Sequence, residues 1–119
     1  MALGERVPER RIPVSVLVPG DDHLGEGPSW DERTSSLTWV DIRRQSIRRW
    51  SWSSGDISTR TLPRDVSLAL PRADSGFVAT QVDHVVLVDE HRHSPLATLD
   101  DANPHTRLND GCVDDEGRL

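Results

Sequence analysis

The chain has 119 residues, enough for one ordinary domain, and a hydrophobic fraction of 34% predicts a loop-rich globular protein with a modest core. Its net charge of −6 excludes an extended basic surface of the kind that binds nucleic acid. The single cysteine, Cys112, excludes an intrachain disulfide and favours a reducing compartment. The longest apolar run near the N-terminus, residues 14–18, is too short for a membrane span. We therefore expect a cytoplasmic protein with no membrane or nucleic-acid partner.

The predicted elements are strands throughout, because apolar residues recur with a period of two and no eleven-residue window has helical spacing. Residues 1–11 are polar and arginine-rich and contain Pro8, so they are interpreted as a flexible lead-in to a domain over residues 12–119. A short strand is expected over residues 12–18. A first set of strands then follows, over residues 28–30, 36–42, 46–53 and 57–62.

The same order of strands and turns then starts again. The second set is predicted over residues 66–70, 77–80, 85–89 and 95–99, and a further start lies at 111–113 before a turn at 114–117. Aligning the first hairpins makes Trp30, Leu70 and Val113 equivalent, at spacings of about 40 residues, which is typical of β-propeller blades. The sequence therefore predicts an all-β fold with two propeller blades and the start of a third. A β-sandwich is the alternative.

The number of predicted blades indicates whether the chain can form a closed propeller. Two sets and one hairpin do not close a ring, because propellers have about four to eight blades. We therefore expect the chain to be the N-terminal part of a longer protein.

One stretch, Leu-Gly-Glu-Gly-Pro-Ser-Trp-Asp at residues 24–31, sets a single carboxylate, Glu26, between two glycines and a proline. The alternating run at residues 37–42 follows it. Glu26 is either a solvated loop residue or a hard oxygen ligand for a divalent cation. The stretch alone does not separate these two readings.

A second stretch, Thr-Arg-Leu-Asn-Asp-Gly, carries Arg107, Asn109 and Asp110. Residues at i and i+2 of an extended segment point to the same side, so Arg107 and Asn109 form a pair while Asp110 points away. A cationic fork beside an amide suits a ligand rich in hydroxyl and carbonyl oxygens, such as a sugar or a sugar acid. Alternatively, Arg107 pairs with Asp100 or Asp101 and Asn109 caps a turn.

Together these stretches resemble the senescence marker protein/gluconolactonase/regucalcin family. The resemblance lies in Glu-x-Pro-x-Trp at 26–30, Trp-Val-Asp-Ile at 39–42, Ile-Arg-Arg-Trp at 47–50 and Arg-x-Asn-Asp-Gly at 107–111, and it runs from about residue 16 to the last residue. It implies a six-bladed propeller with a divalent cation (calcium, zinc, magnesium or manganese) in the central channel. It also implies hydrolysis of a lactone, commonly a sugar lactone.

The resemblance also implies roles for individual residues. Glu26 matches the family's first metal ligand, Arg107 and Asn109 match its substrate-contacting pair, and Asp110 matches a neighbour that supports the site. The two other metal ligands, an asparagine and an aspartate that is also the acid/base, lie on later blades. No catalytic acid/base and no tight metal site are therefore expected within these 119 residues. A non-catalytic calcium-binding propeller and an inactive truncated product are the alternatives.

The remaining candidate groups are expected to be structural. His91 and His93 lie in a polar turn without suitably spaced carboxylates, and Cys112 is expected to be a buried small hydrophobic residue. The tryptophans are interpreted as blade-packing residues: Trp30, Trp39, Trp50 and Trp52. Turn positions account for the acids Asp31, Asp41 and Asp74.

Overall fold

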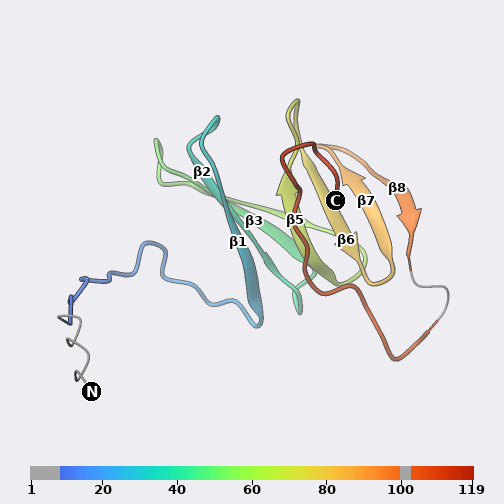
Figure 1. Cartoon of the computed structure of the whole chain (residues 1–119), viewed down its shortest axis with the longest axis horizontal. Helices are drawn as coiled ribbons and strands as arrows, with labels where there is room; N and C mark the ends of the chain where they lie inside the picture. The colour runs from blue at the N-terminus through green and yellow to red at the C-terminus, as the bar shows by residue number, and fades with distance from the viewer. Residues whose placement is uncertain (1–8, 100–102) are drawn as a thin grey trace, which may run out of the picture.

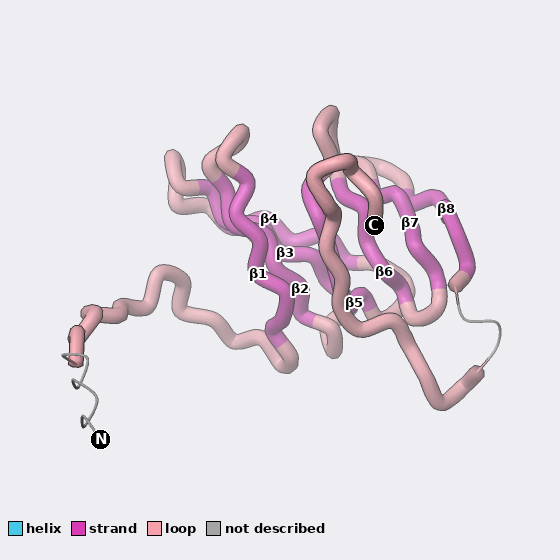
Figure 2. The backbone as a smooth tube through the Cα atoms, viewed as in Figure 1, coloured by secondary structure: helices cyan, strands magenta, loops and turns pink. Residues whose placement is uncertain are grey.

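The computed structural model describes residues 9–99 and 103–119, and within these residues the regular structure consists of eight strands (Figures 1 and 2). The strands are β1 (Gly25–Asp31), β2 (Ser36–Asp41), β3 (Ser46–Ser51), β4 (Ile57–Thr61), β5 (Val66–Pro71), β6 (Phe77–Gln81), β7 (His84–Val88) and β8 (His93–Thr98). They confirm the eight strands predicted between residues 28 and 99, with ends that shift by a few residues. No helix among the described residues is long and apolar enough to cross a membrane.

The strands form two four-stranded antiparallel sheets, each in chain order: β1-β2-β3-β4 and β5-β6-β7-β8. This arrangement is that of two successive blades of a β-propeller. Asp31 pairs with Ser36 at the end of the first hairpin, and Pro71 pairs with Phe77 at the corresponding place in the second sheet. Trp30 and Leu70 precede those pairs, so the structure confirms their predicted equivalence.

The core lies between the two sheets, because each sheet turns one apolar face towards the other. In the first sheet Val40 of β2 pairs with Ile47 of β3, and both side chains are buried. β5 packs against β1 and β2 and supplies Val66 and Ala69 to the same core. Burial of a valine, leucine or isoleucine stabilises a fold by about 1.5–3 kcal/mol. The outermost strands β4 and β8 are largely exposed.

Two predicted strands do not form. Residues 12–18 run as irregular exposed chain, with Val14 92% exposed. Residues 111–113 are also irregular, although the turn predicted after them forms, with the amide of Gly117 donating to the carbonyl of Asp114 at 2.9 Å. Both predictions are wrong for the same reason: an alternating segment becomes a strand only where a second strand pairs with it.

Two expectations for individual side chains also differ from the structure. Cys112 is exposed, so the prediction of a buried residue is wrong. Trp39 and Trp50 are buried as predicted, whereas Trp30 and Trp52 are 47% and 65% exposed. The ring of Trp52 packs edge-to-face against the rings of Trp30 and Trp50, with centroids 6.5 and 5.6 Å apart.

Candidate functional site

The predicted site residues belong to segments that lie along one edge of the two sheets. β1 and β5 both start at the edge that lies lowest in Figure 1, and the turns between β2 and β3 and between β6 and β7 lie along it. The C-terminal segment rises from this edge beside β5 (Figure 1). The first residues of β1 and the residues around Leu108 are therefore positioned by the same edge.

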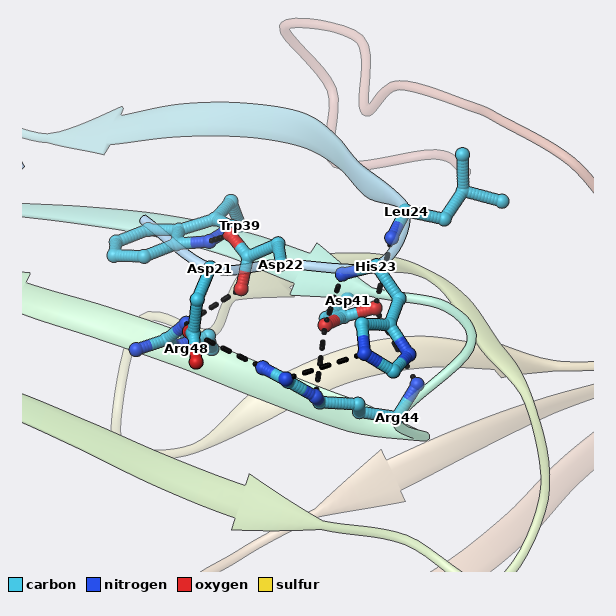
Figure 3. A network of polar contacts seen from close by, with 8 residues as sticks. All are labelled: Asp21, Asp22, His23, Leu24, Trp39, Asp41, Arg44 and Arg48. Carbon is cyan, nitrogen blue, oxygen red and sulfur yellow. Dashed lines mark hydrogen bonds and ion pairs between the residues drawn. The ribbon is translucent and has the colours of Figure 1, made fainter. Parts of the chain in front are cut away.

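The residues just before β1 are held by Asp22 (Figure 3). The indole nitrogen of Trp39 donates to Asp22 at 2.8 Å, and Arg48 forms a hydrogen-bonded ion pair with the same carboxylate. The guanidinium of Arg48 also lies over the Trp39 ring, 5.4 Å from its centroid. The hydrogen bond to Asp22 raises the pKa of Arg48 further above its ordinary range. β2 and β3 thus fix the segment that leads into β1.

Asp41, the last residue of β2, is a second anchor for this segment (Figure 3). Its buried carboxylate accepts hydrogen bonds from the backbone amides of His23 at 2.9 Å, Leu24 at 3.1 Å and Arg44 at 3.3 Å. Burial alone would raise the pKa of Asp41, but these backbone donors and the charge of Arg44 outweigh it, so the pKa lies below its ordinary value. The residues that lead into β1 are therefore tied to the end of β2.

Glu26 is half-buried in β1, opposite Val40 of β2. A β-bulge follows it directly, between Glu26 and Ser29, and Gly27 has the positive φ of 62° that favours glycine. Bulges of this kind redirect side chains at a sheet edge. Glu26 lines a groove of about 420 Å³ together with Trp39 and residues 16–18. Within the described part of the chain, no hydrogen bond or ion pair engages its carboxylate.

Arg107 and Asn109 lie together, as their spacing predicts. The Nη1 atom of Arg107 donates to the Oδ1 atom of Asn109 at 3.0 Å and to the carbonyl of Leu108 at 3.0 Å. Both side chains are exposed and can accept a ligand from solvent. The alternative pairing of Arg107 with Asp100 or Asp101 lies outside the described residues.

Asp110 lies apart from this pair. Its Oδ1 atom accepts a hydrogen bond from the amide of Gly111 at 2.8 Å. It lines a different groove, of about 420 Å³, with Leu68 and Leu96 on the outer face of the second sheet. The structure thus joins Arg107 with Asn109, and among the described residues no hydrogen bond or ion pair links Glu26 to either of them.

The donor set tests whether these residues fit a divalent cation. Glu26 offers one hard carboxylate ligand, whereas calcium takes six to eight oxygen ligands and magnesium six. Residues 9–99 and 103–119 contain no group of three or more His, Cys, Asp or Glu side chains able to hold a metal. Asp22, which lines the same groove as Glu26, is already engaged by Trp39 and Arg48. A cation at Glu26 would therefore need ligands from outside this set.

Sequence reasoning did not identify the anchors of the site. No motif contains Asp22, the motif at 47–50 contains Arg48 but gives it no role, and the sequence indicates only a turn position for Asp41. The available signal was Trp-Val-Asp-Ile, in which an aspartate ends a buried strand and can accept hydrogen bonds from backbone amides. Its partners are backbone amides 17 and 18 residues earlier in the chain, and only the fold brings them close.

The two sheets and the residues at their common edge define part of a β-propeller. The chain belongs to the SMP-30/Gluconolactonase/LRE-like family, whose sequence profile matches residues 24–119. The resemblance drawn from the motifs is thereby confirmed.

The chain is similar to several named proteins. It is 34% identical to regucalcin of Danio rerio and 32% identical to regucalcin of Homo sapiens, each over 109 residues, with 91% and 90% of this chain covered. A solved luciferin-regenerating enzyme matches with a TM-score of 0.72 and 25% identity, over 82% of this chain and 35% of that chain. A calcium-binding protein, regucalcin, of Agrobacterium tumefaciens matches with a TM-score of 0.60 and 26% identity, over 71% and 28%. The chain spans only 37% and 36% of the two curated relatives.

Proposed function

We propose that this chain contributes to a metal-dependent lactonase of the gluconolactonase type, which opens a sugar lactone with water. The observation that carries the proposal is a carboxylate without a partner among the described residues, Glu26, redirected by a bulge at the edge where the Arg107–Asn109 pair follows the second sheet. Family membership supports the same reading. We place the protein in the cytoplasm, with a small-molecule lactone as its partner.

The chemistry assigns a different task to each residue. Glu26 would hold a divalent cation, which when bound polarises the lactone carbonyl and lowers the pKa of a bound water. Arg107 and Asn109 would donate hydrogen bonds to the hydroxyl and ring oxygens of the sugar and orient it, and orientation alone lowers a reaction barrier substantially. Asp110 would support the Arg107–Asn109 segment through its bond to Gly111. The group that protonates the leaving ring oxygen is not among these residues.

The test is hydrolysis of gluconolactone by the protein at its full natural length, with Ca²⁺, Zn²⁺, Mg²⁺ or Mn²⁺ added. Glu26→Gln removes the charge of the ligand and should lower the metal-stimulated rate about 100-fold. Arg107→Gln should chiefly raise KM, since it removes a contact that binds substrate. Glu32→Gln, in the exposed turn after β1, is the matched control and should change neither. Lactone opening that no cation stimulates, or that Glu26→Gln leaves intact, would disprove the proposal.

A calcium-binding module without catalysis is the second candidate, and one similar structure favours it, since that structure is of a calcium-binding protein. It predicts that the full-length protein binds Ca²⁺ in a calorimetric titration and that Glu26→Gln weakens binding, while gluconolactone remains unhydrolysed. Binding together with hydrolysis would favour the lactonase.

A further inference from the structure

The buried hydroxyl groups of Ser67 and Thr80 support the backbone of Leu108, the residue between Arg107 and Asn109. Ser67 is the extra residue at a bulge near the start of β5, between Val66 and Leu68, and it is 3% exposed. Its Oγ atom donates to the carbonyl of Leu108 at 2.8 Å and lies 2.7 Å from the Oγ1 atom of Thr80 in β6. A serine hydroxyl has one hydrogen, so Thr80 is the donor in the second bond. A relay therefore runs from Thr80 through Ser67 to Leu108.

The backbone of Leu108 is held at both of its polar atoms. Its amide donates to the carbonyl of Val82 in the β6–β7 turn at 2.6 Å, while its carbonyl accepts the Ser67 hydroxyl. The same carbonyl accepts the Nη1 atom of Arg107, so both of its lone pairs are used. Leu108 lies between Arg107 and Asn109 in the chain. Its fixed carbonyl and the Asn109 amide oxygen thus define where the Arg107 guanidinium lies.

We infer that Ser67 and Thr80 are positioning residues that preform the Arg107–Asn109 pair for an oxygen-rich ligand, an inference that rests on the substrate role proposed for that pair. The Arg107 side chain is long and exposed, and ordering it at the moment of binding would weaken affinity. The hydroxyl groups of Ser67 and Thr80, which lie inside the second sheet, fix the Leu108 carbonyl before the ligand binds. That carbonyl is an acceptor for the Arg107 guanidinium. β5 shares one feature with β1, since each of the two strands carries a bulge near its start.

The test uses the ¹⁵N-labelled 119-residue chain and two signals: hydrogen exchange of the Leu108 amide and the Nε–Hε resonance of Arg107. Thr80→Val removes the hydroxyl with little change of shape, and Ser67→Ala removes the central link. Each should speed exchange at Leu108 about tenfold and shift the Arg107 resonance, because one hydrogen bond of the held segment is lost. Thr80→Ser restores the hydroxyl and should restore both signals. Thr59→Val, in the exposed strand β4, is the matched control.

The opposite result is equally specific. A Thr80→Val chain that keeps the other amide resonances in place, with Leu108 exchange and the Arg107 resonance unchanged, overturns the positioning role. A second measurement addresses the substrate. In the protein at full natural length, Thr80→Val should raise KM for gluconolactone several-fold with little change in kcat, and Thr59→Val should not. If no gluconolactone is hydrolysed at all, the proposed function fails, while the exchange measurement still decides the role of Ser67 and Thr80.

Discussion

Asp41 is a charged side chain in a fully buried place, and three backbone amides make this arrangement stable. It ends β2, yet its partners His23 and Leu24 precede β1 and Arg44 lies in the following turn. A carboxylate that accepts several backbone hydrogen bonds is favoured in its charged form even when buried. The same side chain therefore closes one turn and anchors the segment that leads to Glu26.

Replacing Asp41 by asparagine tests this anchor. In Asp41→Asn one of the two acceptor oxygens becomes an amide group that points N–H at backbone N–H, so we expect a loss of about 2–3 kcal/mol in the free energy of unfolding. The measurement is urea denaturation at pH 7. Asp56→Asn, at an exposed turn position, is the control and should change stability little.

The pH dependence of this difference follows from the lowered pKa of Asp41. The ordinary value is 3.8 and the folded value lies below it, so the unfolded chain binds the proton more readily. The stabilisation is therefore complete above the unfolded pKa and is lost as the pH falls through the folded pKa. The stability gap between the native protein and Asp41→Asn should narrow below about pH 4. A gap that stays constant down to pH 2 would show that the charge of Asp41 is irrelevant.

Sequence reasoning at this scale succeeded where partners are neighbours in the chain. The i, i+2 spacing predicts that Arg107 and Asn109 meet, and their side chains are 3.0 Å apart. Sequence reasoning failed where the partner is distant in the chain, as for the Ser67 hydroxyl, which donates to a carbonyl 41 residues later. The role of Glu26 as a metal ligand stays a prediction, because it rests on the resemblance and not on a contact.

At the level of elements, the β5–β6 hairpin contains a glycine at which any side chain would clash with a neighbouring strand. Gly76 has a φ of 72°, and a Cβ atom built on it would lie 2.0 Å from the carbonyl oxygen of Val88 at the end of β7. Gly55, in the β3–β4 turn, has a similar φ of 74° but no atom within 4 Å of the corresponding position. Comparing the two glycines therefore separates the cost of a left-handed backbone conformation from the cost of a steric clash.

We therefore predict different effects of the same substitution. Gly55→Ala should cost about 1–2 kcal/mol, the penalty for a left-handed residue with a side chain. Gly76→Ala should cost at least about 2 kcal/mol more, because β7 or the hairpin must move away from the methyl group. The two variants are compared by urea denaturation under identical conditions. Equal losses of unfolding free energy in the two variants would mean that the β5–β6 turn accommodates the methyl group without disturbing β7.

The period-two pattern predicts the eight strands correctly, because each of them has a partner strand in the same sheet. The same pattern predicts strands at residues 12–18 and 111–113, and there it is wrong. Alternation records which side of a segment can be apolar, but it carries no information on whether a partner strand lies beside it. The period-two pattern does not predict the bulges of β1 and β5, although Gly27 and Pro28 mark the first of them.

At the scale of the whole molecule, the recurrence of the four-stranded unit predicts two sheets, and the core between them joins these into one body. Val40 and Ile47 of the first sheet belong to the same buried cluster as Ala79 and Val86 of the second. The exposure of Trp52 could not be predicted from a tryptophan count, because it depends on what covers the outer face of the first sheet. All four tryptophans lie in or next to that sheet, so their fluorescence reports on it alone.

This placement makes the coupling between the sheets measurable. Val86→Ala, in β7, removes two methyl groups from the shared core and should cost about 2 kcal/mol. If both sheets unfold together, the denaturation midpoint seen by tryptophan fluorescence shifts as far as the midpoint seen by far-UV circular dichroism, although no tryptophan lies in the altered sheet. Leu96→Ala, on β8 and 60% exposed, is the control and should shift neither midpoint appreciably. A fluorescence curve unchanged by Val86→Ala, beside a shifted dichroism curve, would show that the sheets unfold independently. In that case the anchors of Glu26 and of the Arg107–Asn109 pair would have to be stabilised separately.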